Sequence, residues 1–133
     1  MGSISLYDRA VGDYKQGLHA LGDAHIDDVM CDMAGYHLQQ AVEKLLKYQI
    51  ELQGDRFPFT HDISQLLDDV VTDVPDWIVA NRETLTKYEA HTRYSSVKVA
   101  SVTNLREWYI FLGEYIQSLK PENDDEFSCE PKL

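Results

Sequence analysis

Cysteine is scarce in this chain of 133 residues, which holds only Cys31 and Cys129. Neither belongs to a CxxC pair or to a Cys/His spacing typical of metal ligands, so we expect no disulfide scaffold, zinc ribbon or iron–sulfur site. The five histidines are dispersed and no HExxH motif occurs. We therefore expect no metal site and no cofactor. A Gly-rich phosphate loop is also missing, which excludes P-loop and dinucleotide-binding folds.

Long apolar runs and basic residues are scarce as well. No segment approaches the roughly 20 apolar residues of a membrane-spanning helix, and the N-terminus lacks a charged-then-apolar signal pattern. The chain has 12 Lys and Arg against 23 Asp and Glu, a formal net charge of −11. This charge disfavours nonspecific binding to duplex DNA or to anionic membranes. We expect a cytoplasmic protein without a membrane or duplex-DNA partner.

Helical periodicity dominates the pattern of apolar residues. It predicts helices over about 4–21, 26–53, 63–70, 76–90 and 97–119, with a break at 91–96. Gly54 and Pro121 follow the ends of the second and fifth of these helices. No run shows convincing strand alternation. The sequence therefore predicts an all-α fold, an antiparallel up-and-down bundle of about five helices within residues 1–120.

Charge is unevenly distributed along the chain. Residues 121–133 carry five acidic side chains against one lysine, and with two prolines and no periodicity they predict an acidic flexible tail. An acidic arm that binds a basic partner is the alternative. Residues 82–106 carry five basic against two acidic side chains. Such a zone can hold phosphate, although a helix surface with scattered charges explains it nearly as well.

A row of polar side chains lies beside the apolar stripe of the second predicted helix. Its members are His37, Gln40, Lys44 and Lys47. At 100° per residue they fall within a sector of about 80°. An imidazole, an amide and two ammonium groups can hold a phosphate or a base edge. The alternative is an ordinary solvated flank, in which Glu43 and Lys47 form a helix-stabilising pair.

Three motifs occur in order along the chain. Residues 36–47 (YHLQQAVEKLLK) match an aromatic-His-x-x-Gln-Ala-x-Glu-Lys pattern, and residues 58–67 (PFTHDISQLL) match Pro-x-Thr-His-Asp followed by leucines. Tyr88 followed by residues 92–94 (TRY) is the third. Together these motifs resemble the HEPN domain family over about residues 4–119. The resemblance implies a five-helix up-and-down bundle that often forms a homodimer.

The resemblance also implies three functional roles. Some HEPN domains pair with a separately encoded nucleotidyltransferase in toxin–antitoxin-like operons, some are proposed to bind nucleotides, and others are metal-independent ribonucleases. Our leading hypothesis is a noncatalytic nucleotide- or substrate-binding partner of a nucleotidyltransferase. The residues that would line and close its groove are His37, Gln40, Lys44, Lys47, His61 and Arg93.

The alternative hypothesis is a metal-independent endoribonuclease that acts on RNA. Arg56 and His61 satisfy the Arg-x4-His motif of that branch. Histidine can shuttle protons near neutral pH, and arginine can stabilise the phosphorane charge. Phe57 stands where the branch usually has Asn or Asp, and the motif precedes the third predicted helix. Whether the protein is an enzyme therefore stays open. The regular stripe of helix 97–119 is the candidate dimer face.

Overall fold

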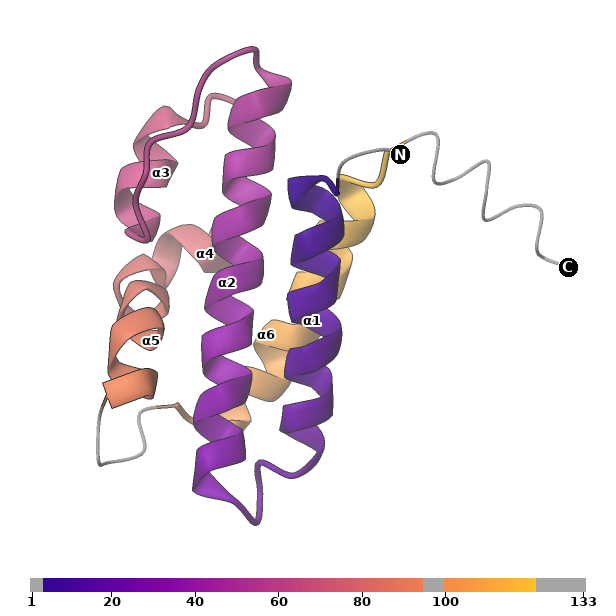
Figure 1. The fold of residues 1–133 in the computed structure, drawn as a ribbon, viewed down its shortest axis with the longest axis vertical. Helices are drawn as coiled ribbons and strands as arrows, with labels where there is room; N and C mark the ends of the chain where they lie inside the picture. Colours follow the sequence, from indigo (N-terminus) through magenta and orange to yellow (C-terminus); the bar gives the residue numbers. More distant parts are fainter. Residues whose placement is uncertain (1–3, 95–99, 122–133) are drawn as a thin grey trace, which may run out of the picture.

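The computed structural model describes residues 4–94 and 100–121, with side chains described over 4–89 and 100–121. Within these ranges there are six α-helices and no strand, which confirms the predicted all-α bundle (Figure 1). The helices are α1 (Leu6–Gly22), α2 (Asp28–Leu52), α3 (Ile63–Asp69), α4 (Asp76–Ala80), α5 (Arg82–Tyr94) and α6 (Val102–Ser118). None of the described helices combines the length and apolarity needed to cross a membrane.

Helix α2 is the central element of the bundle. Its N-terminus is capped by Asp27, whose Oδ1 accepts hydrogen bonds from the backbone N–H groups of Val29 and Met30. In Figure 1 it runs between α1 on one side and α3 and α5 on the other, with α6 behind. Its apolar stripe is completely buried, and it includes Ala34, Leu38, Ala41, Leu45 and Ile50. Burial of this stripe is the main source of stability for the bundle.

A close approach between α1 and α6 locks three helices together. The Tyr109 hydroxyl on α6 donates to the backbone oxygen of Ala34 on α2 at 2.7 Å. Its ring lies against Gly17 on α1, where an added Cβ would stand 1.6 Å from the Tyr109 oxygen. Because of this close approach, only glycine fits at position 17. Burial at this contact also raises the pKa of Tyr109 well above its ordinary value.

The single helix predicted over 76–90 is wrong, because the chain divides there into α4 and α5 at Asn81. The Asn81 side-chain Nδ2 donates to the Trp77 carbonyl at 2.8 Å. This side chain ends α4 by competing with the backbone for a helical acceptor. The Leu85 N–H then donates to the Asn81 carbonyl at 2.9 Å and begins α5. Helix α5 continues to Tyr94, so the break predicted at 91–96 is wrong over 91–94.

Helix α6 begins five residues later than predicted, because Ser101 caps it by accepting a hydrogen bond from the Asn104 N–H. The apolar stripe expected to form a dimer face is instead largely buried within the chain's own core, as Leu105, Tyr109 and Leu112 show. Any homodimer must therefore use another surface. The predicted tail lies outside the described residues, apart from its first residue.

Candidate functional site

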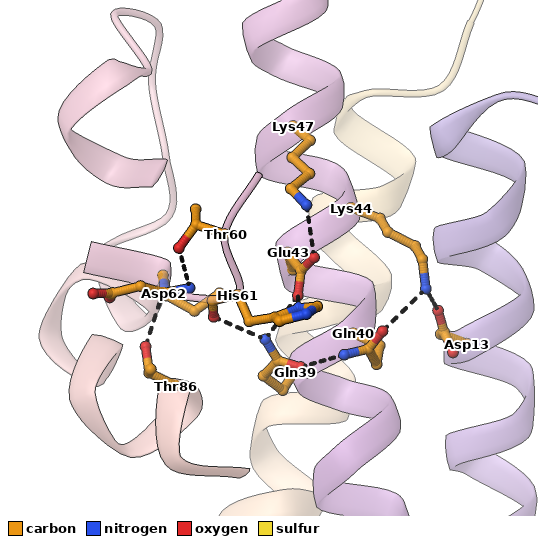
Figure 2. Close-up of polar contacts among 11 residues, drawn as sticks. Asp13, Gln39, Gln40, Glu43, Lys44, Lys47, Thr60, His61, Asp62 and Thr86 are labelled. Atoms are coloured by element: carbon orange, nitrogen blue, oxygen red, sulfur yellow. Dashed lines mark hydrogen bonds and ion pairs between the residues drawn. The ribbon is translucent and has the colours of Figure 1, made fainter. Parts of the chain in front are cut away.

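Two clusters of polar side chains with similar composition lie along α2, and Figure 2 shows the members of both except His37. Each has a carboxylate that bonds one lysine and one histidine. We call them the Asp13 cluster (Asp13, His37, Lys44) and the Glu43 cluster (Gln39, Glu43, Lys47, His61). The spacing of 3.6 residues per turn aligns their α2 members along one side of the helix.

The Asp13 cluster joins α1 to α2. Asp13 Oδ2 accepts from Lys44 Nζ at 2.5 Å, and Asp13 Oδ1 lies 3.0 Å from His37 Nδ1. The carboxylate is 15% exposed and the imidazole 20% exposed. Burial alone would raise the pKa of Asp13, but hydrogen bonds from His37 and Lys44 outweigh burial and hold that pKa below its ordinary value. The cluster therefore stabilises the charged carboxylate.

The Glu43 cluster joins α2 to the connector that follows it. Glu43 Oε1 lies 3.0 Å from His61 Nδ1 and accepts from Gln39 Nε2 at 3.1 Å, while Oε2 accepts from Lys47 Nζ at 2.8 Å. The carboxylate is only 5% exposed. Burial would raise the pKa of Glu43, but the three hydrogen bonds, that of Lys47 first, hold the pKa below its ordinary value.

Gln40 links the two clusters into one continuous row. Its Nε2 donates to Gln39 Oε1 at 2.7 Å, and its Oε1 accepts from Lys44 Nζ at 3.4 Å. The chain of contacts therefore runs from Asp13 on α1, across α2, to His61 (Figure 2). We call the members of both clusters together with Gln40 the polar row; they are Asp13, His37, Gln39, Gln40, Glu43, Lys44, Lys47 and His61. A connected network of this kind restricts the orientation of its members.

Hydrogen bonds hold the connector between α2 and α3 at His61 and at the residues next to it. Gln39 Nε2 donates to the His61 carbonyl at 3.3 Å, and the Thr60 hydroxyl accepts from the Asp62 N–H at 3.0 Å. Asp62 caps α3 by accepting from the Ser64 N–H at 2.9 Å. The imidazole, held at Nδ1, is still 61% exposed. Most of the ring is therefore accessible to solvent.

Arg56 lies in a different environment from His61. It is exposed and lines a cavity of about 290 Å³ together with Glu51, Asp55, Phe57 and Phe59. His61 is not among the residues that line this cavity. The structure thus places Arg56 beside two carboxylates and gives no contact between Arg56 and His61. The side chain of Arg93 lies outside the described residues.

The comparisons with known proteins identify the fold family. The family model described as HEPN domain matches residues 7–120. The chain belongs to the HEPN family. No curated protein and no solved structure matches it. The matched range holds all six described helices apart from the first residue of α1.

Within this HEPN domain, the predicted ligand residues of α2 lie on one side of the helix, but each ammonium group has an internal partner. Lys44 is paired with Asp13, and Lys47 with Glu43. Two carboxylates thus balance two ammonium groups, so these two ion pairs give the polar row no net positive charge. Among the described residues, no group of three or more acidic, histidine or cysteine side chains could hold a metal ion.

Sequence reasoning missed three members of the polar row in this HEPN domain, Asp13, Gln39 and Glu43, the last of which was considered only as a helix-stabilising partner of Lys47. Asp13 was overlooked, although it lies three residues after Ala10 and four before Gly17, both of which are buried. A carboxylate on the buried side of a helix needs a partner, and this was the available signal. Gln39 gave no such signal, because its bonds depend on how the connector folds back over α2.

Proposed function

We propose that this HEPN protein is a noncatalytic binding subunit that holds a nucleotide or a nucleotide-like substrate for a separately encoded nucleotidyltransferase. The observation that carries the proposal is the polar row, which ends in an imidazole fixed by Glu43 and 61% exposed. A polar group that is held in place by its neighbours can form a directed hydrogen bond with a ligand at a small cost in side-chain entropy. Family membership supports the nucleotidyltransferase as the partner, as one half of a toxin–antitoxin-like pair.

Two features favour binding over cleavage. The ammonium groups of Lys44 and Lys47 are neutralised by internal carboxylates, so they supply little charge for a phosphorane. Arg56 lines a cavity to which His61 does not contribute, so the two residues of the Arg-x4-His motif do not share one cavity. A bound nucleotide would meet the Gln40 amide, the His61 imidazole and the partly exposed Lys44, whereas Lys47 is 11% exposed and stays paired with Glu43. We expect modest affinity because no backbone loop cradles the phosphate.

The experiment is calorimetric titration of the full chain with AMP and with ATP, in EDTA at low salt. Wild-type protein should bind one of them saturably, and His61→Ala should weaken binding about tenfold, the loss of one charged hydrogen bond. His25→Ala, at an exposed histidine before α2, is the matched control and should bind like wild type. Absence of saturable binding by wild type would refute the nucleotide site.

The partner is tested separately by co-purification with a minimal nucleotidyltransferase from the same organism. A complex stable at micromolar concentration is expected, and failure to form one contradicts the partner assignment. The mass of the protein alone, by light scattering, tests the expected homodimer in the same experiment.

One observation favours the endoribonuclease as a second candidate. The contact between His61 Nδ1 and the buried Glu43 carboxylate is the arrangement that orients a general acid or base. In that function His61 transfers the proton, Glu43 orients the His61 imidazole, and Arg56 supplies positive charge to stabilise the phosphorane. RNA cleavage in EDTA should then be lost in His61→Ala and Arg56→Ala and kept in His25→Ala. No cleavage by wild type removes this candidate.

A further inference from the structure

A second cavity lies between α4 and α6 and takes no part in the polar row. Its volume is about 470 Å³, within the range of small-molecule sites. The lining residues are Pro75, Asp76, Trp77, Phe111, Glu114, Tyr115 and Ser118. The cavity thus combines three aromatic rings with two carboxylates.

Trp77 forms the aromatic wall of this cavity. Its ring stacks on Trp108, with centroids 6.1 Å apart and planes inclined by 27°, and it packs against Phe111 at 6.2 Å. Its Nε1 is shielded from water and has no acceptor among the described residues. An indole N–H buried without an acceptor is unfavourable. The Trp77 ring is therefore held by aromatic packing and not by a hydrogen bond, and it lines the cavity.

The charged groups of this cavity are of one sign. Asp76 and Glu114 are exposed, and none of the lining residues is basic. Aromatic faces attract cations through their negative quadrupole, and nearby carboxylates add to this attraction. The formal net charge of −11 also draws cations toward the protein.

We propose that this cavity binds an organic cation, a primary ammonium group on an apolar or aromatic stem. The stem would pack on Trp77 and Phe111, and the ammonium group would meet Asp76 and Glu114. This site is independent of the proposed function, since none of its residues belongs to the polar row.

The first test compares two probes of nearly the same shape, 2-phenylethylamine and its neutral counterpart 2-phenylethanol. Both are titrated into the full chain at low salt and followed by calorimetry and by the indole N–H resonances. Trp77 and Trp108 are the two tryptophans, and loss of one signal in Trp77→Phe assigns both. The amine should bind saturably, at least tenfold tighter than the alcohol, and should shift the Trp77 signal more than that of Trp108.

A third probe is a short peptide with a single lysine, which carries the same chemistry on a protein. Tighter binding of the peptide than of the amine would identify a partner's lysine side chain as the source of the cation. Weaker binding would identify a free amine. Both results support an organic-cation site.

Variants of the two acidic lining residues and of Trp77 test whether the cavity binds a cation. In Asp76→Asn combined with Glu114→Gln, amine binding should fall about tenfold while alcohol binding stays unchanged. Glu107→Gln is the matched control, an exposed glutamate of α6 that does not line the cavity. Trp77→Phe should weaken amine binding about fivefold, because tryptophan is the strongest cation–π partner. Equal affinity for amine and alcohol, or a double variant that binds the amine like wild type, would overturn the proposal.

Discussion

The Asp13 and Glu43 clusters contain the same three kinds of charged or titratable group but perform different tasks. In the first, a carboxylate of α1 bonds a lysine and a histidine of α2, so the cluster fastens two helices. In the second, the carboxylate and the lysine share α2, and the histidine comes from the connector. His37 is 20% exposed and His61 is 61% exposed. The element that supplies the histidine decides whether it stabilises the fold or faces solvent.

The two carboxylates also differ in depth. Glu43 is 5% exposed and accepts three hydrogen bonds, whereas Asp13 is 15% exposed and accepts from two side chains. Lys47, the partner of Glu43, is 11% exposed, and Lys44, the partner of Asp13, is 23% exposed. Removal of either carboxylate therefore leaves one lysine without its partner, and the lysine left by removal of Glu43 is the more deeply buried.

The largest effect on stability is expected for Glu43→Ala. It leaves the Lys47 ammonium buried without its counter-charge, which costs about 3–5 kcal/mol of the free energy of unfolding. Urea unfolding followed by circular dichroism measures this loss. Glu107→Ala, at an exposed site on α6, should stay within about 0.5 kcal/mol of wild type. A loss below about 1 kcal/mol in Glu43→Ala would show that Lys47 reaches water on its own.

Asp13→Ala should have a smaller effect, about 1–3 kcal/mol, since it breaks the bonds to His37 and Lys44. Lys44 is closer to solvent than Lys47, so its ammonium group can recover hydration. The same urea series gives the ranking. If Asp13→Ala proved more destabilising than Glu43→Ala, the contrast between the two clusters would be wrong.

Acid should weaken both clusters. The pKa values of both carboxyls lie below their ordinary values, 3.8 for Asp13 and 4.5 for Glu43. In this range the unfolded chain binds more protons than the folded one, so the free energy of unfolding decreases as pH falls. The stabilisation is complete above 4.5 and is lost as pH falls through each folded pKa. Urea midpoints measured between about pH 6 and pH 3 should decline less steeply in Glu43→Gln than in wild type.

The smallest effects on stability are expected for the two histidine variants, and they should differ between the clusters. His61→Ala should cost less than about 0.5 kcal/mol, because the imidazole is mostly solvated and Glu43 keeps its bonds to Gln39 and Lys47. His37→Ala should cost about 1 kcal/mol, because its bond to Asp13 is more shielded. Paired thermal and urea unfolding of the two variants checks the order. Equal losses would mean that exposure of the imidazole does not distinguish the clusters.

The helical pattern made much of this fold predictable. Apolar spacing located α1 and α2 within a few residues, because one face of each is buried in the core. The division at Asn81 was not predictable from periodicity, because it depends on a side chain that bonds the Trp77 carbonyl. The lysines of the polar row were recognised, and the pairing of Lys47 with Glu43 was the alternative interpretation, four residues apart on one helix. The pairing of Lys44 was not predictable, because its partner is Asp13, thirty-one residues away along the chain.

The pairing of α1 with α6 has a consequence for chain topology. The Tyr7 hydroxyl donates to the Ile116 carbonyl at 3.2 Å, and Figure 1 shows the start of α1 beside the end of α6. A short Gly/Ser linker could therefore join residue 121 to residue 4, and new ends could be opened after Gly54, an exposed turn at φ 90°. Such a circular permutant keeps every helix intact and carries His61 close to its new N-terminus, where labels or tethered ligands can be attached beside the polar row.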